Sequence, residues 1–242
     1  MNIFYRSVVF SLILAFFWVT PTYAGDPFKK GMTIKLAYAI PQGGFGENMP
    51  LNPLNPFNYR YTLNTMNSGI GLQLGTMYFL NFIDLGDKMA LGIDVTWLST
   101  TYQIGNYDFV RNYVDENINY TDAGEFDMYY LYFSAEAGPS FSFSPNEKLA
   151  FDLSFKLSPT FALSGGDYPL ESIGDSERLG ASAFGLRYCP AFYFRYSLLM
   201  LGVEYNMGDL DLQYKTTGII ELTESQVSMP FDGLRLILGV KF

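Results

Sequence analysis

Apolar and polar residues alternate along most of the chain with a period of two residues. In the last ten residues, Phe242, Val240, Leu238, Leu236 and Leu234 form one apolar stripe, and the positions between them hold Gly, Lys and Arg residues apart from Ile237. Successive side chains of a β-strand point to opposite faces, so this period predicts a strand with one apolar face. The pattern occurs eight times, at about 31–40, 67–80, 88–104, 127–143, 148–164, 182–194, 198–208 and 233–242.

The connections between these segments alternate in length. Those near 81–87, 144–147 and 195–197 are short, and those at 41–66, 105–126, 165–181 and 209–230 are long. Short periplasmic turns and long extracellular loops are typical of an outer-membrane barrel. In lipid, the edges of an open sheet would keep unsatisfied N–H and C=O groups, so the sheet must close. The sequence therefore predicts an all-β, transmembrane, antiparallel up-and-down β-barrel of eight strands.

Three positions disturb the alternation. Proline cannot donate a hydrogen bond to its neighbour, so Pro139 and Pro159 predict bulges or bends inside their strands. Beyond Asn206, the alternation over 209–214 runs in the opposite phase, which predicts a bulge there as well.

The first 24 residues have the pattern of a secretory signal peptide. Arg6 supplies a positive charge, an apolar run extends from Val8 to Val19, and the small residue Ala24 precedes the expected cleavage point. The apolar run is too short to span a bilayer as a helix. We therefore expect a signal peptide at 1–24 and one outer-membrane β-barrel domain at 25–242.

Composition and charge argue against nucleic-acid binding and against a disulfide within the chain. Aromatic residues make up 18% of the chain and its net charge is −9, with no basic stripe that could neutralise nucleic-acid phosphates. Cys189 is the only cysteine, so no disulfide can form within the chain. Its place on the polar face of a strand predicts a small packing residue.

The polar faces of the strands carry four bases and four acids. The interior of an eight-stranded barrel is only wide enough for side chains to fill it, and buried charges need partners. The sequence predicts an ion-pair network that plugs the lumen, and a narrow path for small ions or solutes is the alternative. The network comprises Lys35, Asp94, Glu136, Asp152, Lys156, Arg187, Glu204 and Arg235.

Catalysis has little support in the sequence. The chain has no histidine, the commonest general base and metal ligand. Lipid A deacylases, the outer-membrane phospholipase and omptin-type proteases resemble one another in using a histidine. A calcium-like loop that begins at Asp115 has Tyr120 and Phe126 where glycine and glutamate are needed. We therefore expect that the protein has no catalytic, metal or cofactor site and that it is not an enzyme.

These features together resemble a known group. A signal peptide, eight alternating strands, a charged lumen and a terminal Phe242 resemble the small OmpA/OmpX-type outer-membrane barrels. The stretch from Gly138 to Phe143 and the long acidic loops resemble outer-membrane barrel domains of Bacteroidetes, including the PorT-like group. The resemblance implies residence in the outer-membrane lipid of a Gram-negative bacterium. It also implies that the barrel assembly machinery recognises Phe242 as a C-terminal signal.

The expected role is structural or partner-binding. It would be membrane integrity, or contact with protein or lipopolysaccharide through acidic loops. The PorT-like resemblance implies a further alternative, an accessory part in a protein secretion system.

Overall fold

A computed structural model describes residues 27–42, 48–50, 58–80, 82–115, 118–170, 175–217, 226–230 and 233–242. The expected signal peptide lies outside these residues. The described chain consists of strands joined by turns, with these bounds: β1 Gly31–Pro41, β2 Asn48–Pro50, β3 Asn58–Met66, β4 Gly69–Phe79, β5 Met89–Asp115, β6 Ile118–Asn146, β7 Leu149–Leu170, β8 Asp175–Tyr196, β9 Leu199–Asn206, β10 Asp209–Thr217, β11 Gln226–Pro230 and β12 Gly233–Lys241. Among the described residues, no helix is long and apolar enough to cross a membrane.

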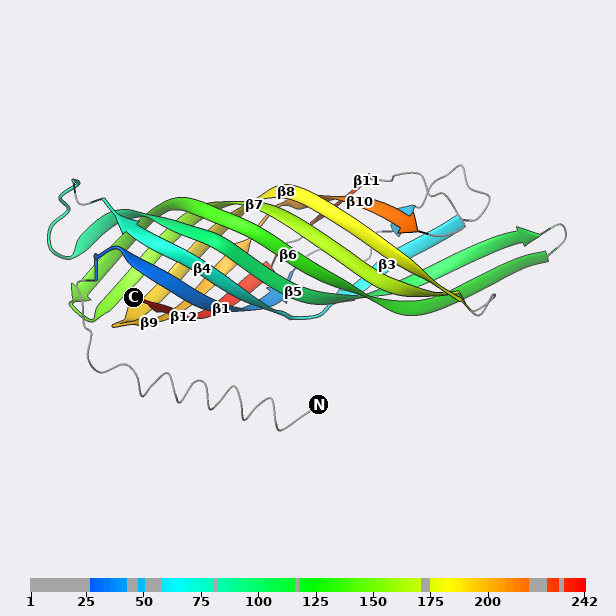
Figure 1. Ribbon diagram of the computed structural model, residues 1–242, viewed down its shortest axis with the longest axis horizontal. Helices are drawn as coiled ribbons and strands as arrows, with labels where there is room; N and C mark the ends of the chain where they lie inside the picture. Colours follow the sequence, from blue (N-terminus) through cyan, green and yellow to red (C-terminus); the bar gives the residue numbers. More distant parts are fainter. Residues whose placement is uncertain are drawn as a thin grey trace, which may run out of the picture.

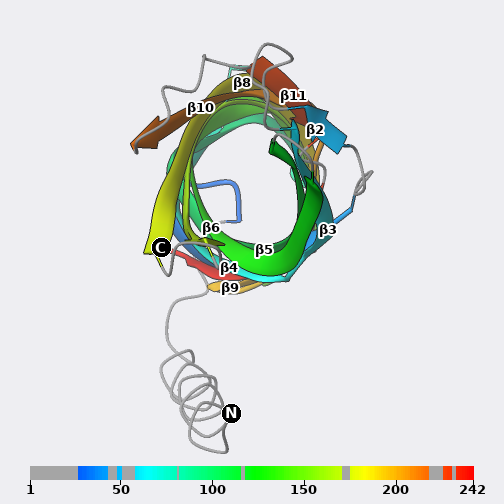
Figure 2. The same ribbon diagram turned by 90° about the vertical axis from the view of Figure 1, so that its right-hand side faces the viewer.

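The strands close into a ring. β1 pairs with β4 on one side and with β12 on the other, and β4 to β8 follow in sequence order. β9 pairs with both β8 and β12, which closes the circle (Figure 2). β3 continues the path of β4 along β5, and β10 and β11 continue the paths of β9 and β12. Counted around the ring, the barrel thus has eight antiparallel strand paths, as the sequence predicts. The paths are β1, β3 with β4, β5, β6, β7, β8, β9 with β10, and β11 with β12.

The strands extend further than the sequence pattern indicates. β5 has 27 residues and β6 has 29, and they pair up to Asp115 and Ile118 (Figure 1). Most of the expected loop at 105–126 is therefore a β-hairpin, and β7 and β8 similarly occupy most of 165–181. Outside lipid a hairpin needs no apolar face, because each strand satisfies the backbone of the other. The short connections at the opposite end agree with the prediction.

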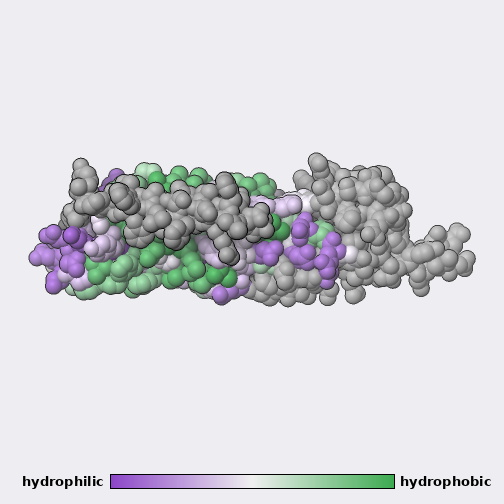
Figure 3. All heavy atoms as spheres, turned by 90° about the horizontal axis from the view of Figure 1, so that it is seen from below, coloured by the Kyte–Doolittle hydropathy of each residue, from purple (hydrophilic) through white to green (hydrophobic). Residues whose placement is uncertain are grey.

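The two faces of the sheet follow the predicted phase. Leu36, Ile70, Leu153 and Leu201 point outward and are exposed, whereas the alternate residues point inward and are buried. Figure 3 shows one side of the molecule, where an apolar band lies between two hydrophilic regions. This band is the surface that lipid covers.

The bulges lie elsewhere than the sequence suggests. The register of β6 with β5 is unchanged at Pro139, and that of β7 with β8 is unchanged at Pro159. The bulge in this part of the barrel is in β5, where the register shifts between Thr96 and Ser99. Trp97 and Leu98 both face outward there, so a bulge exposes two adjacent apolar side chains to lipid.

The expected bulge after Asn206 is also absent. β9 and β10 keep one register along β8, and Leu210 is buried inside the barrel. The strand path is interrupted at Gly208, whose φ of 132° suits glycine. Inward and outward positions therefore keep their order past Asn206. Leu210 is apolar at an inward position because this stretch of the interior is itself apolar.

The lipid face gives the first testable prediction. Leu153→Arg should lower the free energy of unfolding by about 2–4 kcal/mol, because a charge near the bilayer midplane loses its hydration. Leu153→Met is the matched control and should cost little. The measurement is denaturant unfolding in lipid vesicles, followed by the shift between folded and unfolded bands on an unheated gel. Equal losses for the two variants would contradict the outward placement of Leu153.

Candidate functional site: a charged barrel interior

All eight charged residues expected on the inner face are buried there. They come from β1, β5, β6, β7, β8, β9 and β12, because each occupies an inward position in the alternation. Two further bases, Arg195 and Lys241, are buried in the same interior. The described interior therefore contains six bases and four acids.

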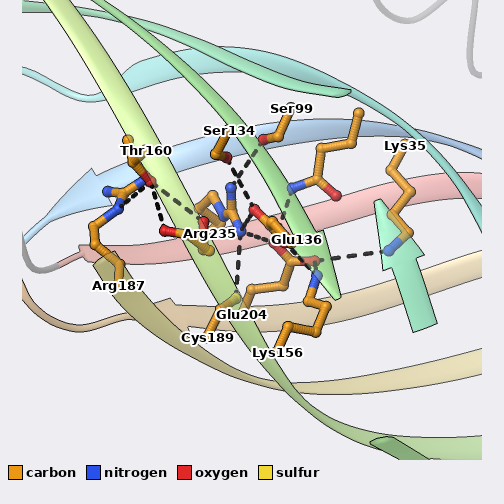
Figure 4. A network of polar contacts seen from close by, with 12 residues as sticks. Lys35, Ser99, Ser134, Glu136, Lys156, Thr160, Arg187, Cys189, Glu204 and Arg235 are labelled. Atoms are coloured by element: carbon orange, nitrogen blue, oxygen red, sulfur yellow. Dashed lines mark hydrogen bonds and ion pairs between the residues drawn. The ribbon is translucent and has the colours of Figure 1, made fainter. Parts of the chain in front are cut away.

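Two glutamates and two bases form the centre of this interior (Figure 4). Arg235 Nη2 lies 2.7 Å from Glu136 Oε1 and 2.5 Å from Glu204 Oε2. Lys156 Nζ lies 2.5 Å from Glu136 Oε2 and 3.0 Å from Glu204 Oε1. Each carboxylate therefore contacts both cations, and each cation contacts both carboxylates. The contacts join the neighbouring strands β6 and β7 to the neighbouring strands β9 and β12.

Tyr193 and Lys35 enlarge the cluster. The Tyr193 hydroxyl donates to Glu204 and accepts hydrogen bonds from Lys35 Nζ at 3.0 Å and Lys156 Nζ at 3.2 Å. Lys35 Nζ also lies 3.8 Å from both Asp94 Oδ2 and Glu204 Oε1. Gln73 Nε2 donates to Glu204 Oε2 at 2.8 Å. The cluster thereby contains three acids and three bases, and their charges balance.

A second ion pair lies near the end with short turns. Arg195 makes two hydrogen bonds to Asp152, from Nε to Oδ2 at 2.5 Å and from Nη2 to Oδ1 at 2.9 Å. Such a forked pair is among the strongest charge-assisted contacts. Ser142 Oγ donates to Asp152 Oδ1 at 2.5 Å. Asp152 is therefore satisfied by Arg195, not by the bases of the central cluster.

The segment before β1 closes this end of the barrel. The Pro27 carbonyl accepts hydrogen bonds from Arg195 Nη1 and Lys241 Nζ, both at 3.0 Å. The Phe28 ring meets the edge of Phe79 with the ring centroids 5.7 Å apart. Figure 2 shows the start of the described chain, in blue, inside the ring of strands. The segment thus covers the ion pair beneath it.

Arg187 lies apart from both groups. Its Nε donates to Thr160 Oγ1 at 3.0 Å, and its guanidinium lies 5.9 Å from the centre of the Tyr132 ring. No acid of the described residues is within ion-pair distance of it. Arg187, an expected member of the ion-pair network, therefore makes no ion pair with the described acids. Asp152, Glu136 and Glu204 are contacted by Arg195, Lys156 and Arg235 instead.

The interior toward the long hairpins is mainly apolar and aromatic. Tyr130 and Tyr132 stack with ring centroids 6.2 Å apart, and the Tyr132 hydroxyl lies 3.9 Å from Met66 Sδ. Met128 and Leu210 are also fully buried. These side chains fill the lumen beyond the charged cluster.

Glu136, Cys189 and Glu204 are the described residues that come closest to a metal site. One ligand atom from each lies within 4.8 Å of the others. However, both carboxylates contact Lys156 and Arg235, and Arg235 Nη2 donates to Cys189 Sγ at 3.3 Å. These cations occupy the position that a metal ion would need. The chemistry that this arrangement supports is charge pairing.

The sequence reasoning missed Arg195, Tyr193 and Gln73 as members of the network. Arg195 lies just beyond the predicted end of its strand, and continuing the alternation would have placed both Tyr193 and Arg195 inside. Gln73 and Tyr193 are uncharged, so the distribution of charged residues along the strands does not indicate them.

Comparison with known proteins gives a fold and no family. No protein-family model matches the chain, and no curated protein sequence matches it. The structure of the outer membrane protein OprG from Pseudomonas aeruginosa matches with a TM-score of 0.51 at 12% identity, over 90% of this chain and 98% of that chain. Ail, the attachment invasion locus protein of Yersinia pestis, matches with a TM-score of 0.39 at 14% identity, over 88% and 97%. The outer membrane protease OmpT from Escherichia coli matches with a TM-score of 0.40 at 10% identity, over 87% and 94%.

The ring of strands, its apolar outer band and the likeness to OprG define the class. The protein is an outer-membrane β-barrel, located in the bacterial outer membrane.

The central cluster gives the second prediction. Arg235→Met should lower the free energy of unfolding by about 3–5 kcal/mol, because it leaves Glu136 and Glu204 short of one buried partner. Adding Glu136→Gln should restore part of the loss, since the two sites share a contact. Gel-shift unfolding in detergent measures both effects, with Lys88→Met at an exposed turn as the control. An Arg235→Met barrel as stable as the Lys88→Met barrel would show that the cluster is hydrated.

Proposed function

We propose that this protein is a non-conducting, non-enzymatic barrel that anchors an extended β-sheet outside the membrane for contact with a partner. The observation that carries the proposal is the filled interior. A balanced charged cluster occupies its centre, the segment at Pro27 covers one end, and Tyr130, Tyr132 and Leu210 fill the other. An eight-stranded barrel filled in this way leaves no continuous aqueous path.

The acids of the interior support a role without catalysis. A general acid or base needs an atom that can donate or accept a proton within reach of a substrate. Glu136, Glu204 and Asp152 are instead fully buried and held by Lys156, Arg235 and Arg195. Their geometry suits a structural function.

The outer sheet, by which we mean the β5–β6 hairpin at about 105–126 and the strands beside it, supports a role in binding. β6 pairs with β7 only as far as Tyr129 and Gly165, although β6 continues outward to Ile118. Along this stretch, the edge of β6 that faces away from β5 has no partner among the described strands. An unpaired edge is a template for an added strand. Asp108 and Glu125 lie on this hairpin, so its charge favours a cationic partner.

The partner that we favour is a protein with an extended basic segment. Lipopolysaccharide bridged through divalent ions is a less specific use of the same acidic surface. The resemblance of the sequence to PorT-like barrels makes a component of protein secretion one candidate partner.

Electrical recording tests the closed interior. The purified protein in a planar lipid bilayer should show no steady openings, because the charged cluster and both end closures block the lumen. The control is a porin purified and inserted in the same way. Steady, ion-selective openings from the folded barrel would replace our proposal with a narrow channel.

Labelling on whole cells tests the outer sheet. Cys189 is buried and should not react, so single cysteines can report exposure. Glu125→Cys should react with a membrane-impermeant maleimide, and Lys88→Cys on the opposite turn should not. A photo-crosslinking residue at position 125 should then capture a partner that the same residue at position 88 does not. Labelling at position 88 alone would reverse the orientation, and no adduct at position 125 would remove the binding role.

A further inference from the structure

Arg187 is a buried charge that the network does not neutralise. Its side chain comes from β8, and only 7% of the residue is exposed. The single hydrogen bond to Thr160 uses Nε, so the two terminal nitrogens of the guanidinium make none with the described residues. A buried charge without an opposite partner is costly, which requires another source of negative charge.

Pairing each buried acid with a buried base shows where bases outnumber acids in the interior. Asp94, Glu136 and Glu204 match Lys35, Lys156 and Arg235, and Asp152 matches Arg195. Lys241 lies at the mouth, where it binds the Pro27 carbonyl. The described interior therefore has two more bases than acids, and these are Lys241 beside Pro27 and Arg187 beside Thr160.

A second buried hydrogen-bond donor, on Arg235, has no acceptor among the described residues. Arg235 Nε is fully buried and has no hydrogen-bond partner, although the terminal nitrogens of Arg235 contact Glu136, Glu204, Ser99 and Cys189. The charge of Arg235 repels that of Arg187, and the more weakly acting charge of Glu136 attracts it. Figure 4 shows Arg187 and Thr160 on the side of Arg235 that faces away from Lys35.

The walls around Arg187 are small and polar. Ser158 and Thr160 are fully buried on β7, with their hydroxyls 3.3 Å apart. On the other side, Gly208 faces the Arg187 side chain, and a Cβ atom at Gly208 would lie 3.4 Å from Arg187 Cγ. Guanidinium and hydroxyl groups of this kind donate hydrogen bonds to an anion.

We infer that the barrel binds one small monovalent anion, such as chloride, at Arg187. The anion accepts hydrogen bonds from the terminal nitrogens of Arg187 and from the Ser158 hydroxyl, because the Thr160 hydroxyl donates to the Ser158 carbonyl at 3.0 Å. It neutralises the charge that no acid of the described interior matches. A single negative charge suffices, because the remaining acids and bases of the central cluster balance. This inference does not depend on the outer sheet or its partner.

Stability in a series of salts tests the site. At constant ionic strength, replacing gluconate by chloride should raise the temperature at which the folded gel band is lost, and the rise should saturate, because the ligand binds the folded state alone. Arg187→Gln should abolish this dependence. Lys148→Gln, at an exposed turn remote from the site, should keep it.

A direct measurement makes the result independent of that variant's folding. Crystals of the wild-type protein grown in bromide should show an anomalous peak beside the Arg187 guanidinium, and Arg187→Lys should retain weaker chloride dependence. Absence of the peak would overturn the inference. Equal stability of the wild type in gluconate and chloride would overturn it too, as would chloride dependence that persists in Arg187→Gln.

Discussion

A charge enclosed by this barrel must find its partner inside the barrel. Glu136, Glu204 and Lys156 are almost inaccessible to solvent, with at most 1% of each residue exposed. In such surroundings an unpaired charge costs far more than at a protein surface. The interlocked contacts of two carboxylates with two cations meet this constraint, and they hold β6, β7, β9 and β12 at fixed positions around the ring. The strand paths are thus joined through the interior as well as through their backbones.

The backbone adapts to bring these side chains together. At Gly138, β6 and β7 approach so closely that a Cβ atom would overlap the Phe155 carbonyl oxygen and would lie 2.7 Å from Lys156 Cα. Only glycine fits this contact, which lies between Glu136 and Pro139 on β6. The bulge at Trp97 has a similar effect in β5, because the shift in register turns Ser99 inward, where its hydroxyl accepts a hydrogen bond from Arg235 Nη1 at 3.1 Å.

Much of this architecture could be predicted from the sequence, because lipid and lumen impose opposite demands on alternate residues. The eight strand paths, their inward and outward faces and the burial of Lys35, Asp94 and Glu204 all follow from the period of two. The period of two does not indicate which acid pairs with which base. The pairing depends on how far each strand is shifted along its neighbours. In this barrel Arg195 contacts Asp152, and Arg187 contacts Thr160. Prolines were also poor guides to bulges, since the register at Pro139 and Pro159 is unchanged, whereas the adjacent apolar pair Trp97–Leu98 was the informative signal.

The charged interior and the long hairpin of β5 and β6 are two separate parts of the molecule. Ion pairs connect strands inside the barrel, whereas the edge of β6 beyond Tyr129 has no partner among the described strands. The central claim is that the charged cluster is closed to water, and solid-state NMR of the protein in lipid bilayers tests it most directly. Magnetisation transferred from water should reach the side-chain nitrogens of Lys88 and Lys148 quickly and those of Lys35 and Lys156 slowly. Equally fast transfer to Lys156 and Lys88 would show a hydrated lumen and contradict the account.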